Sequence, residues 1–120
     1  MSKETSLELV LNFGPDGKTS IPVVTQDSKS KQVLLLAYVN KEAFEKTIQT
    51  GYATYWSRSR NCLWTKGETS GDKLKIKDIL INCEQNSLLY LVEPARTNTC
   101  HTGRKSCFYR RIKNGKLEFI

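Results

Sequence analysis

The 120-residue chain has no long apolar segment. Its longest unbroken apolar run, Val33 to Val39, is far too short to span a bilayer. Residues 1–12 also lack the basic start, the apolar stretch and the small-residue cleavage site of a signal peptide. These absences predict a soluble, cytoplasmic protein with no membrane partner. In a reducing compartment, cysteines are more often metal ligands or reactive groups than halves of disulfides.

Histidines and closely spaced cysteine pairs are also scarce. The chain has one histidine, His101, and lacks both the Cys-x2-Cys spacing of zinc ribbons and fingers and the paired motifs of zinc base deaminases. It does contain Cys83, Cys100 and Cys107, separated by sixteen and six residues, and His101 directly follows the second of them. This cluster is the candidate for the chemistry of the protein.

Three thiolates can hold a zinc ion and leave its fourth position open for water, which is the ligand number of a catalytic site. We therefore predict that Cys83, Cys100 and Cys107 bind zinc and that His101 handles the proton of that water. Alternatively, Cys83 and Cys107 are small apolar residues on strands, as free cysteines often are. Cys62, in a polar stretch, is interpreted as an ordinary residue, because a fourth ligand would close the site.

Negative charge is in short supply in the second part of the chain. The net charge is +7, and all of the excess lies in residues 51–120, where thirteen Lys and Arg face six Asp and Glu. One interpretation is a solvated basic face. The other is a pocket for an anion, either a phosphorylated metabolite or nucleic acid.

The apolar pattern predicts one helix and several strands. Asn40 is expected to cap a helix over residues 41–50 that ends at Gly51. Its apolar face should consist of Ala43, Phe44, Thr47 and Ile48. Strands are predicted over residues 20–27, 33–39, 53–59, 74–83, 87–92, 106–112 and 117–120.

Details of this pattern set the expected fold. The continuous run at 33–39 should be covered on both faces, residues 66–72 should form a loop, and Asn114–Gly115 should turn a hairpin. The predicted fold class is mainly β with one helix (α+β), in a single domain over residues 1–120. A core this small would gain from burial shared in a dimer.

Several segments together resemble the phosphoribosyl-AMP cyclohydrolase family. The resemblance covers about residues 20–110 and lies in the segments 24–27 (VTQD), 36–43 (LAYVNKEA), 55–60 (YWSRSR), 63–71 (LWTKGETSG) and 100–108 (CHTGRKSCF). It implies a hydrolase of histidine biosynthesis that opens the adenine ring of 1-(5-phosphoribosyl)-AMP between N1 and C6 by adding water. It also implies a mixed, folded sheet in an intertwined homodimer.

The resemblance further implies a zinc ion held by three cysteines, one of them from the partner subunit, at the positions of Cys83, Cys100 and Cys107. Ribose attached at N1 places positive charge on the adenine ring, so C6 is electrophilic, and a metal acidifies its water. Three thiolates give zinc much charge, which weakens that acidification and makes a nearby base valuable. We predict that His101 is this catalytic base.

The substrate of this family carries two phosphates, and the basic region offers partners for them. The predicted cations are Arg58, Arg60, Lys66, Arg104 and Lys105. The predicted hydroxyl and backbone donors are Ser57, Ser59, Thr69 and Ser70. Trp56 or Trp64 could stack on the purine, although core packing is the simpler role for either.

One segment departs from the family pattern Asp-Cys-Asp-x-Asp, whose aspartates are implied to bind magnesium. This chain has Asn82, Glu84 and Asn86 at the three positions around Cys83. Magnesium favours charged oxygens, so going from three carboxylates to one should weaken its binding. A weak Mg²⁺ site completed by substrate phosphate, a lost site with zinc alone, and a divergent relative with another phosphorylated purine substrate all remain open.

A different class of function is a basic zinc-containing module that binds nucleic acid, through the aromatic and basic residues 55–64. A missing fourth zinc ligand argues against it, because structural zinc sites are normally closed. A third possibility is an inactive relative that serves an interaction. The leading expectation is an enzyme with a small-molecule substrate, a homodimeric partner and no nucleic acid.

Overall fold

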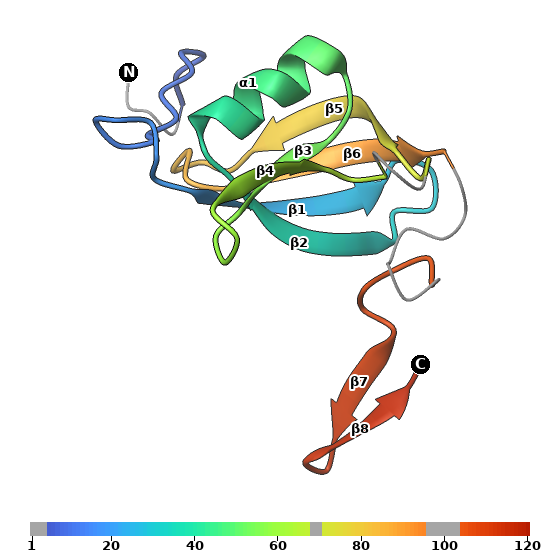
Figure 1. Cartoon of the computed structure of the whole chain (residues 1–120). Helices are drawn as coiled ribbons and strands as arrows, with labels where there is room; N and C mark the ends of the chain where they lie inside the picture. Colours follow the sequence, from blue (N-terminus) through green and yellow to red (C-terminus); the bar gives the residue numbers. More distant parts are fainter. Residues whose placement is uncertain (1–4, 68–70, 96–103) are drawn as a thin grey trace.

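The computed structural model describes residues 5–67, 71–95 and 104–120, which form eight strands and one helix (Figure 1). In chain order they are β1 (Ile21–Asp27), β2 (Val33–Val39), α1 (Lys41–Thr50), β3 (Thr54–Ser57), β4 (Cys62–Thr65), β5 (Leu74–Ile81), β6 (Leu88–Pro94), β7 (Arg110–Lys113) and β8 (Lys116–Phe119). No helix within these ranges is long and apolar enough to cross a membrane.

The main sheet has four strands in the order β2-β1-β6-β5. β1 pairs with β2 in antiparallel and with β6 in parallel orientation, and β5 is antiparallel to β6. The sheet is therefore mixed. The predicted mainly β fold with one helix and a mixed sheet is confirmed.

The two faces of this sheet have different environments. On one face, cross-strand neighbours such as Thr25 and Tyr90 are fully buried, and Val23 lies beside them in the core. On the opposite face, Val24 pairs with Leu36 on one side and with Leu89 on the other, and Leu89 pairs with Leu80. Leu36 is 51% exposed and Leu80 is 44% exposed. An apolar row thus crosses all four strands and keeps much of its surface open.

Helix α1 lies over the buried face and packs against β3 and β2. It begins at Asn40, whose side chain accepts a hydrogen bond from the N–H of Ala43 at 2.9 Å, and it ends at Gly51 in the left-handed region (φ 78°). Thr47 fixes it to the next strand, because its hydroxyl oxygen accepts the N–H of Thr54 at 3.0 Å. The helix is as predicted in its bounds and caps.

Strands β3 and β4 form a hairpin that packs on β2. Tyr55 is fully buried, and its hydroxyl lies 2.7 Å from that of Thr25 on β1. Burial raises the pKa of the Tyr55 phenol well above its usual value, so it stays neutral and hydrogen-bonded. This contact joins the hairpin to the centre of the main sheet.

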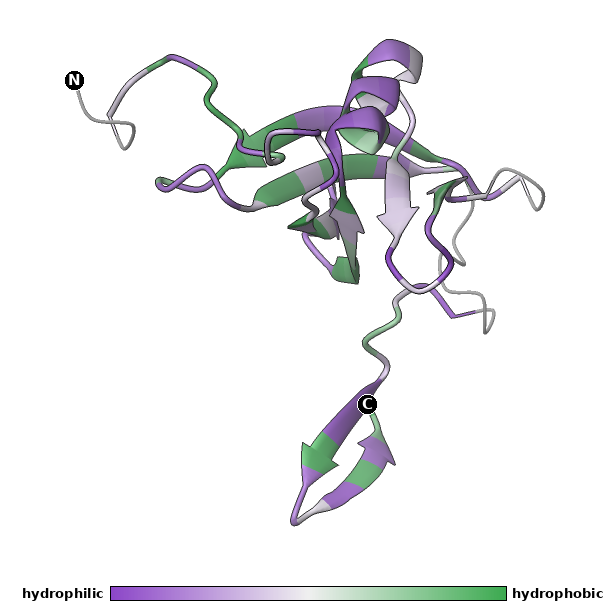
Figure 2. Cartoon of the chain, turned by 60° about the vertical axis from the view of Figure 1, so that its left-hand side comes forward, coloured by the Kyte–Doolittle hydropathy of each residue, from purple (hydrophilic) through white to green (hydrophobic). Residues whose placement is uncertain are grey.

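Strands β7 and β8 form an arm that projects from the rest of the molecule (Figure 1). The predicted Asn-Gly turn is confirmed, since Asn114 and Gly115 both have positive φ between the paired Lys113 and Lys116. The alternating colours in Figure 2 show an apolar and a polar face. Every residue of both strands is exposed, including Ile112 at 81% and Phe119 at 66%. A two-stranded hairpin of this kind is at best marginally stable by itself.

The segment before the arm is fixed to the start of β2. Cys107 donates its N–H to the carbonyl of Leu34 at 2.8 Å, and the buried hydroxyl of Ser106 donates to the carbonyl of Val33 at 2.6 Å. Lys105 forms an ion pair with Asp27 at 3.3 Å. These contacts place Cys107 at an edge of the sheet.

Some sequence-based expectations are wrong. The run 33–39 is not covered on both faces, because β2 is an edge strand with Val33 and Leu36 exposed. Ile48 is 58% exposed and does not contribute to the buried face of the helix. The strand predicted over 106–112 begins only at residue 110, since residues 105–107 are engaged with Asp27 and β2. Strand β4 was not predicted, because its sequence is short and flanked by polar residues.

Asp27 should contribute to stability in a pH-dependent way. Its burial alone would raise the pKa of the carboxyl, but hydrogen bonds from the N–H groups of Lys29 and Ser30 and the charge of Lys105 outweigh burial and hold this pKa below 3.8. A lowered pKa in the folded state stabilises the protein above the unfolded-state pKa, and this contribution is lost as the pH falls through the folded-state value.

We predict that Asp27→Asn lowers the free energy of unfolding by about 1 kcal/mol at pH 7, because a charge-assisted contact becomes a neutral one. Urea unfolding from pH 7 to pH 3 should show this difference beginning to shrink near pH 3.8, where Asp27 of the unfolded chain becomes protonated, and shrinking further toward the lower folded-state pKa. Asp16→Asn is the matched control, since Asp16 is exposed and accepts a hydrogen bond from the neighbouring N–H of Lys18. A difference that persists undiminished at pH 3 would contradict the ion-pair explanation.

Candidate functional site

A groove of about 560 Å³ runs between β2 and the β3–β4 hairpin, within the range of roughly 300–1,000 Å³ that is usual for small-molecule sites. Its lining residues are Leu35, Leu36, Ser57, Arg60, Cys62, Trp64, Lys66 and Cys107. Two predicted phosphate-binding cations, one predicted zinc ligand and one predicted hydroxyl donor therefore share one groove. We call it the Cys107 groove.

An adjoining groove of about 520 Å³ extends it along β2. It shares Leu36, Ser57 and Trp64 with the Cys107 groove, and its further lining residues are Ala37, Tyr38, Trp56, Arg58 and Ser59. The guanidinium carbon of Arg58 lies 3.5 Å from the centre of the Tyr38 ring, a cation–π contact that holds this side chain over β2. Ser57, Arg58 and Ser59 therefore line this groove, and Arg60 lines the Cys107 groove beside it.

The turn between β3 and β4 is ordered by its own side chains. The hydroxyl oxygen of Ser57 accepts the N–H of Arg60 at 3.2 Å and lies 3.4 Å from the hydroxyl of Ser59. Asn61 adopts positive φ and completes the reversal. As a result, two cations project from one short turn that needs no partner to form.

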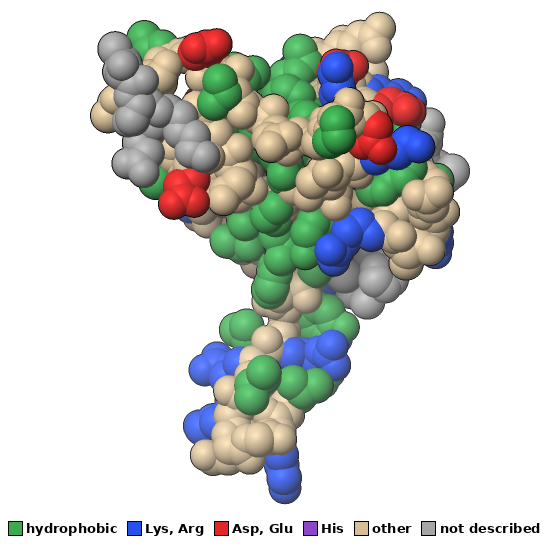
Figure 3. Space-filling view, turned by 90° about the vertical axis from the view of Figure 1, so that its left-hand side faces the viewer, with side chains coloured by type: hydrophobic (Ala, Val, Ile, Leu, Met, Phe, Trp, Pro, Cys, Tyr) green, Lys and Arg blue, Asp and Glu red, His purple; other side chains and the backbone are tan. Residues whose placement is uncertain are grey.

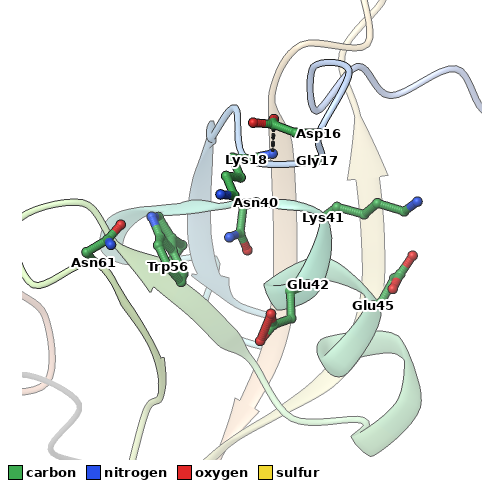
Figure 4. Close-up of a pocket in the computed structure, with 9 residues that line it drawn as sticks. All are labelled: Asp16, Gly17, Lys18, Asn40, Lys41, Glu42, Glu45, Trp56 and Asn61. Carbon is green, nitrogen blue, oxygen red and sulfur yellow. Dashed lines mark hydrogen bonds between the residues drawn. The ribbon is translucent and has the colours of Figure 1, made fainter.

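Both tryptophans of this region are partly buried against the core, as the packing interpretation expected. Trp64 lies against Tyr55, with ring centres 4.7 Å apart, and still lines the Cys107 groove. Trp56 lies at the border of a third pocket, of about 530 Å³, shown in Figure 4. There it faces Asn40 and Lys18, with Glu42 below and Asp16 bonded to the N–H of Lys18. Among the predicted site residues that the structure describes, Trp56 alone lines that pocket.

Two of the predicted phosphate-binding cations have other partners. Lys105 is paired with Asp27 beyond the end of β1, and Arg104 lies over the rings of Tyr109 and Phe119, with its guanidinium carbon 4.4 Å and 4.9 Å from their centres. Neither residue lines the Cys107 groove. Their predicted role in substrate binding stays a prediction, and the structure assigns them contacts that position the segment before the arm.

The two described cysteines of the predicted zinc set lie at opposite ends of the sheet. Cys107 is bonded to Leu34 at the start of β2, at the level of Tyr90 of β6, whereas Cys83 lies in the turn before β6 begins. With a rise of ~3.3 Å per residue, their offset along the strands alone is about 15 Å. Two sulfurs on one zinc are at most about 4.6 Å apart.

One copy of the chain therefore cannot bring Cys83 and Cys107 to the same ion. Consistently, no group of three or more His, Cys, Asp or Glu side chains suited to a metal occurs among the described residues. Both cysteines are exposed, so their sulfurs can meet ligands from a second chain. Cys100 and His101, together with the predicted donors Thr69 and Ser70, lie outside the described residues.

The turn around Cys83 connects β5 with β6. Asn82, Glu84 and Asn86 lie together there, and hydrogen bonds join Asn86 to each of the other two. They are on the turn side of the sheet, away from Cys107 of the same chain.

Sequence reasoning missed three residues that shape the site. Tyr38 holds Arg58, Ser106 fixes the chain beside Cys107, and Asp27 pairs with Lys105. Asp27 and Tyr38 lie in the segments 24–27 and 36–43, which resemble the family. This could have marked both residues as candidates, but neither was given a role. Cys62, interpreted as ordinary, lines the same groove as Cys107.

Comparison with known proteins agrees with this arrangement. Residues 35–109 match the family model described as phosphoribosyl-AMP cyclohydrolase. A phosphoribosyl-AMP cyclohydrolase of Archaeoglobus fulgidus is 54% identical over 102 residues, which cover 85% of this chain and 94% of the relative. One of Desulfotalea psychrophila is 49% identical, covering 89% and 84%.

A histidine biosynthesis bifunctional protein of Aquifex aeolicus is 44% identical over 92% of this chain but only 53% of its own length. Most of β2, the β3–β4 hairpin, the Cys83 turn and Cys107 fall inside the matched range 35–109. The match thus spans most of the chain and every described residue of the candidate zinc set. This chain belongs to the phosphoribosyl-AMP cyclohydrolase family.

Proposed function

We propose that this chain catalyses the hydrolytic opening of the adenine ring of 1-(5-phosphoribosyl)-AMP at the N1–C6 bond, a step of histidine biosynthesis. The observation that carries the proposal is the Cys107 groove, which joins a candidate zinc thiolate to Arg60 and Lys66 inside the matched range. A purine with a phosphate at each end requires this combination of an apolar wall, cations and a metal ligand.

The groove supports binding of such a substrate through complementary charge. Arg60 and Lys66 line it, and Arg58 projects from the same turn. Cations of this kind bind phosphate through charge-assisted hydrogen bonds. Leu35, Leu36 and Trp64 supply the apolar surface against which a purine can lie. The same residues therefore orient the ring toward Cys107.

Zinc is proposed to be held by Cys83 of one protomer with Cys100 and Cys107 of its partner. Exposed thiols are suited to zinc, and the separation of Cys83 from Cys107 within one chain supports a site built from two copies. When bound, zinc lowers the pKa of a water molecule and supplies the nucleophile near neutral pH. The imidazole of His101 is proposed to take up the proton from this water.

A homodimer is supported by two unsatisfied surfaces. The apolar row through Leu36, Val24, Leu89 and Leu80 crosses the open face of the sheet, and the arm exposes Ile112 on its apolar face. Figure 3 shows apolar side chains on the arm and on the body next to it. Suppose that the open sheet faces of two copies pack on each other about a two-fold axis that lies perpendicular to the strands. The strands of one copy then run in the opposite direction to those of the other. The Cys83 end of one sheet then meets the Cys107 end of the other.

The reduced state of the proposed ligands supports a cytoplasmic location, where thiols are kept from forming disulfides.

The most direct test of the proposed reaction is a measurement of turnover. Purified zinc-loaded protein is mixed with phosphoribosyl-AMP, and the absorbance of the opened product is followed. Absence of turnover at every zinc concentration would refute the proposed activity.

The first prediction from the proposed function concerns the zinc ligands. Cys107→Ser should lose bound zinc and turnover together, because a serine hydroxyl is a poor zinc ligand at neutral pH. Elemental analysis gives the zinc per chain. Cys62→Ser, a change of the same kind in the same groove, should keep both. Equal zinc loss in the two variants would show that Cys62 is also a ligand and that the site is closed.

The second prediction concerns the proton. His101→Ala should reduce turnover on the order of a hundredfold, the usual size of a general-base contribution, and leave the zinc content unchanged. Steady-state kinetics together with elemental analysis separate the two effects. A wild-type rate would show that His101 plays no part, and a loss of zinc would make it a ligand instead.

The third prediction concerns the shared site. Cys83→Ser and Cys107→Ser should each be inactive alone, but unfolding and refolding them as an equal mixture should restore about one quarter of wild-type turnover, because half of the dimers are mixed and each has one intact site. The unmixed variants, refolded in the same way, are the control. A mixture that stays inactive while forming dimers would place all three ligands in one chain.

A further inference from the structure

The turn that presents Cys83 is closed by amide side chains. The side-chain oxygen of Asn82 accepts the N–H groups of Asn86 and Ser87, each at 2.9 Å, and its side-chain nitrogen donates to the side-chain oxygen of Asn86 at 2.5 Å. The amide nitrogen of Asn86 in turn donates to a carboxylate oxygen of Glu84 at 3.4 Å. Each amide thus has both a donated and an accepted bond within the turn.

A second set of contacts fixes the same turn from outside. Gln85 is 7% exposed and adopts positive φ (56°). Its side-chain oxygen accepts the N–H of Val10 at 2.8 Å, and its side-chain nitrogen donates to the carbonyl of Glu8 at 3.1 Å. The N–H of Gln85 itself donates to the carbonyl of Asn82 at 3.0 Å. The conformation around Cys83 is therefore established by protein groups alone.

These contacts do not fit a magnesium ion at the positions of Asn82, Glu84 and Asn86. Mg²⁺ requires near-octahedral oxygen ligands at about 2.0–2.1 Å and favours carboxylates. The Asn82 oxygen already accepts two backbone N–H groups, and the Asn86 oxygen accepts the Asn82 amide. Glu84 offers the only charged oxygens of the three.

Replacement of carboxylates by amides changes the interaction between positions 82 and 86 from repulsion to attraction. Two carboxylates at positions 82 and 86 would lie in direct contact and repel each other, so they would need a cation between them. Two amides in the same places attract each other, because one donates and the other accepts. The hydrogen bond between the side chains of Asn82 and Asn86 thus holds these two positions together, as a cation would hold two carboxylates together.

We propose that the Asn82–Asn86 turn is a metal-free substitute for the second metal site that the family pattern implies, and that this chain positions Cys83 without magnesium. The claim that Cys83 is positioned without magnesium rests on the hydrogen bonds of the turn. Only the consequence for turnover, which should require zinc and not magnesium, rests on the proposed function. The two parts are therefore tested by different measurements.

The test is a calorimetric titration of the zinc-loaded full chain with MgCl₂, combined with thermal unfolding with and without MgCl₂. The wild type should give no saturable heat up to millimolar MgCl₂ and no change in melting temperature. Asn82→Asp combined with Asn86→Asp should melt several degrees lower in metal-free buffer and recover on addition of MgCl₂, with a saturable heat. Asn12→Asp combined with Asn114→Asp is the matched control, because both positions are exposed turns and the charge change is equal.

Saturable magnesium binding by the wild type that disappears in Asn82→Ala would overturn the proposal. So would a double Asp variant that gains neither a heat signal nor a magnesium-dependent rise in melting temperature, because positions 82 and 86 would then not replace a metal site. If the double variant fails to fold, the wild-type titration decides alone. Calorimetry does not depend on turnover, so an inactive enzyme that still binds no magnesium would refute the reaction and leave the amide turn intact.

Discussion

The pairing of β1 with neighbours on both sides is the constraint on which the rest of the structure depends. β1 runs antiparallel to β2 and parallel to β6, and its inward residues Val23 and Thr25 are fully buried. The parallel pairing obliges the chain to return to the same end of the sheet, which explains why the turn holding Cys83 and the start of β2 lie apart. A change of register by one residue would exchange the buried and open faces.

The site is built on edges rather than in the core. Strand β2 supplies one wall of the Cys107 groove because it is an outer strand, and the segment at Ser106 and Cys107 attaches to its carbonyls. The β3–β4 hairpin supplies the other wall and the cations. Attachment to an edge strand leaves a groove open to solvent, as the proposed two-chain site needs.

The cations of the basic region have two different kinds of surroundings. Lys105 and Arg104 serve to position the chain through Asp27 and the rings of Tyr109 and Phe119, whereas Arg60 and Lys66 line the groove. A basic region that looks uniform in the sequence thus divides into cations that contact other parts of the chain and cations that line the groove. In the Cys83 turn, amide groups take the place of charges altogether.

The sequence by itself determined the local elements and the family. Asn40, Gly51 and the Asn114–Gly115 turn act through their own backbone preferences, so they could be predicted without a fold. The strand within residues 53–59 could be predicted in the same way, whereas its pairing with β4 in a hairpin could not. Only the tertiary structure decided that β2 is an edge strand, that Asp27 holds Lys105, and that Cys83 and Cys107 lie too far apart to share an ion within one chain. Strand order and long-range contacts arise from how whole faces pack, and no local pattern encodes which strand lies outermost.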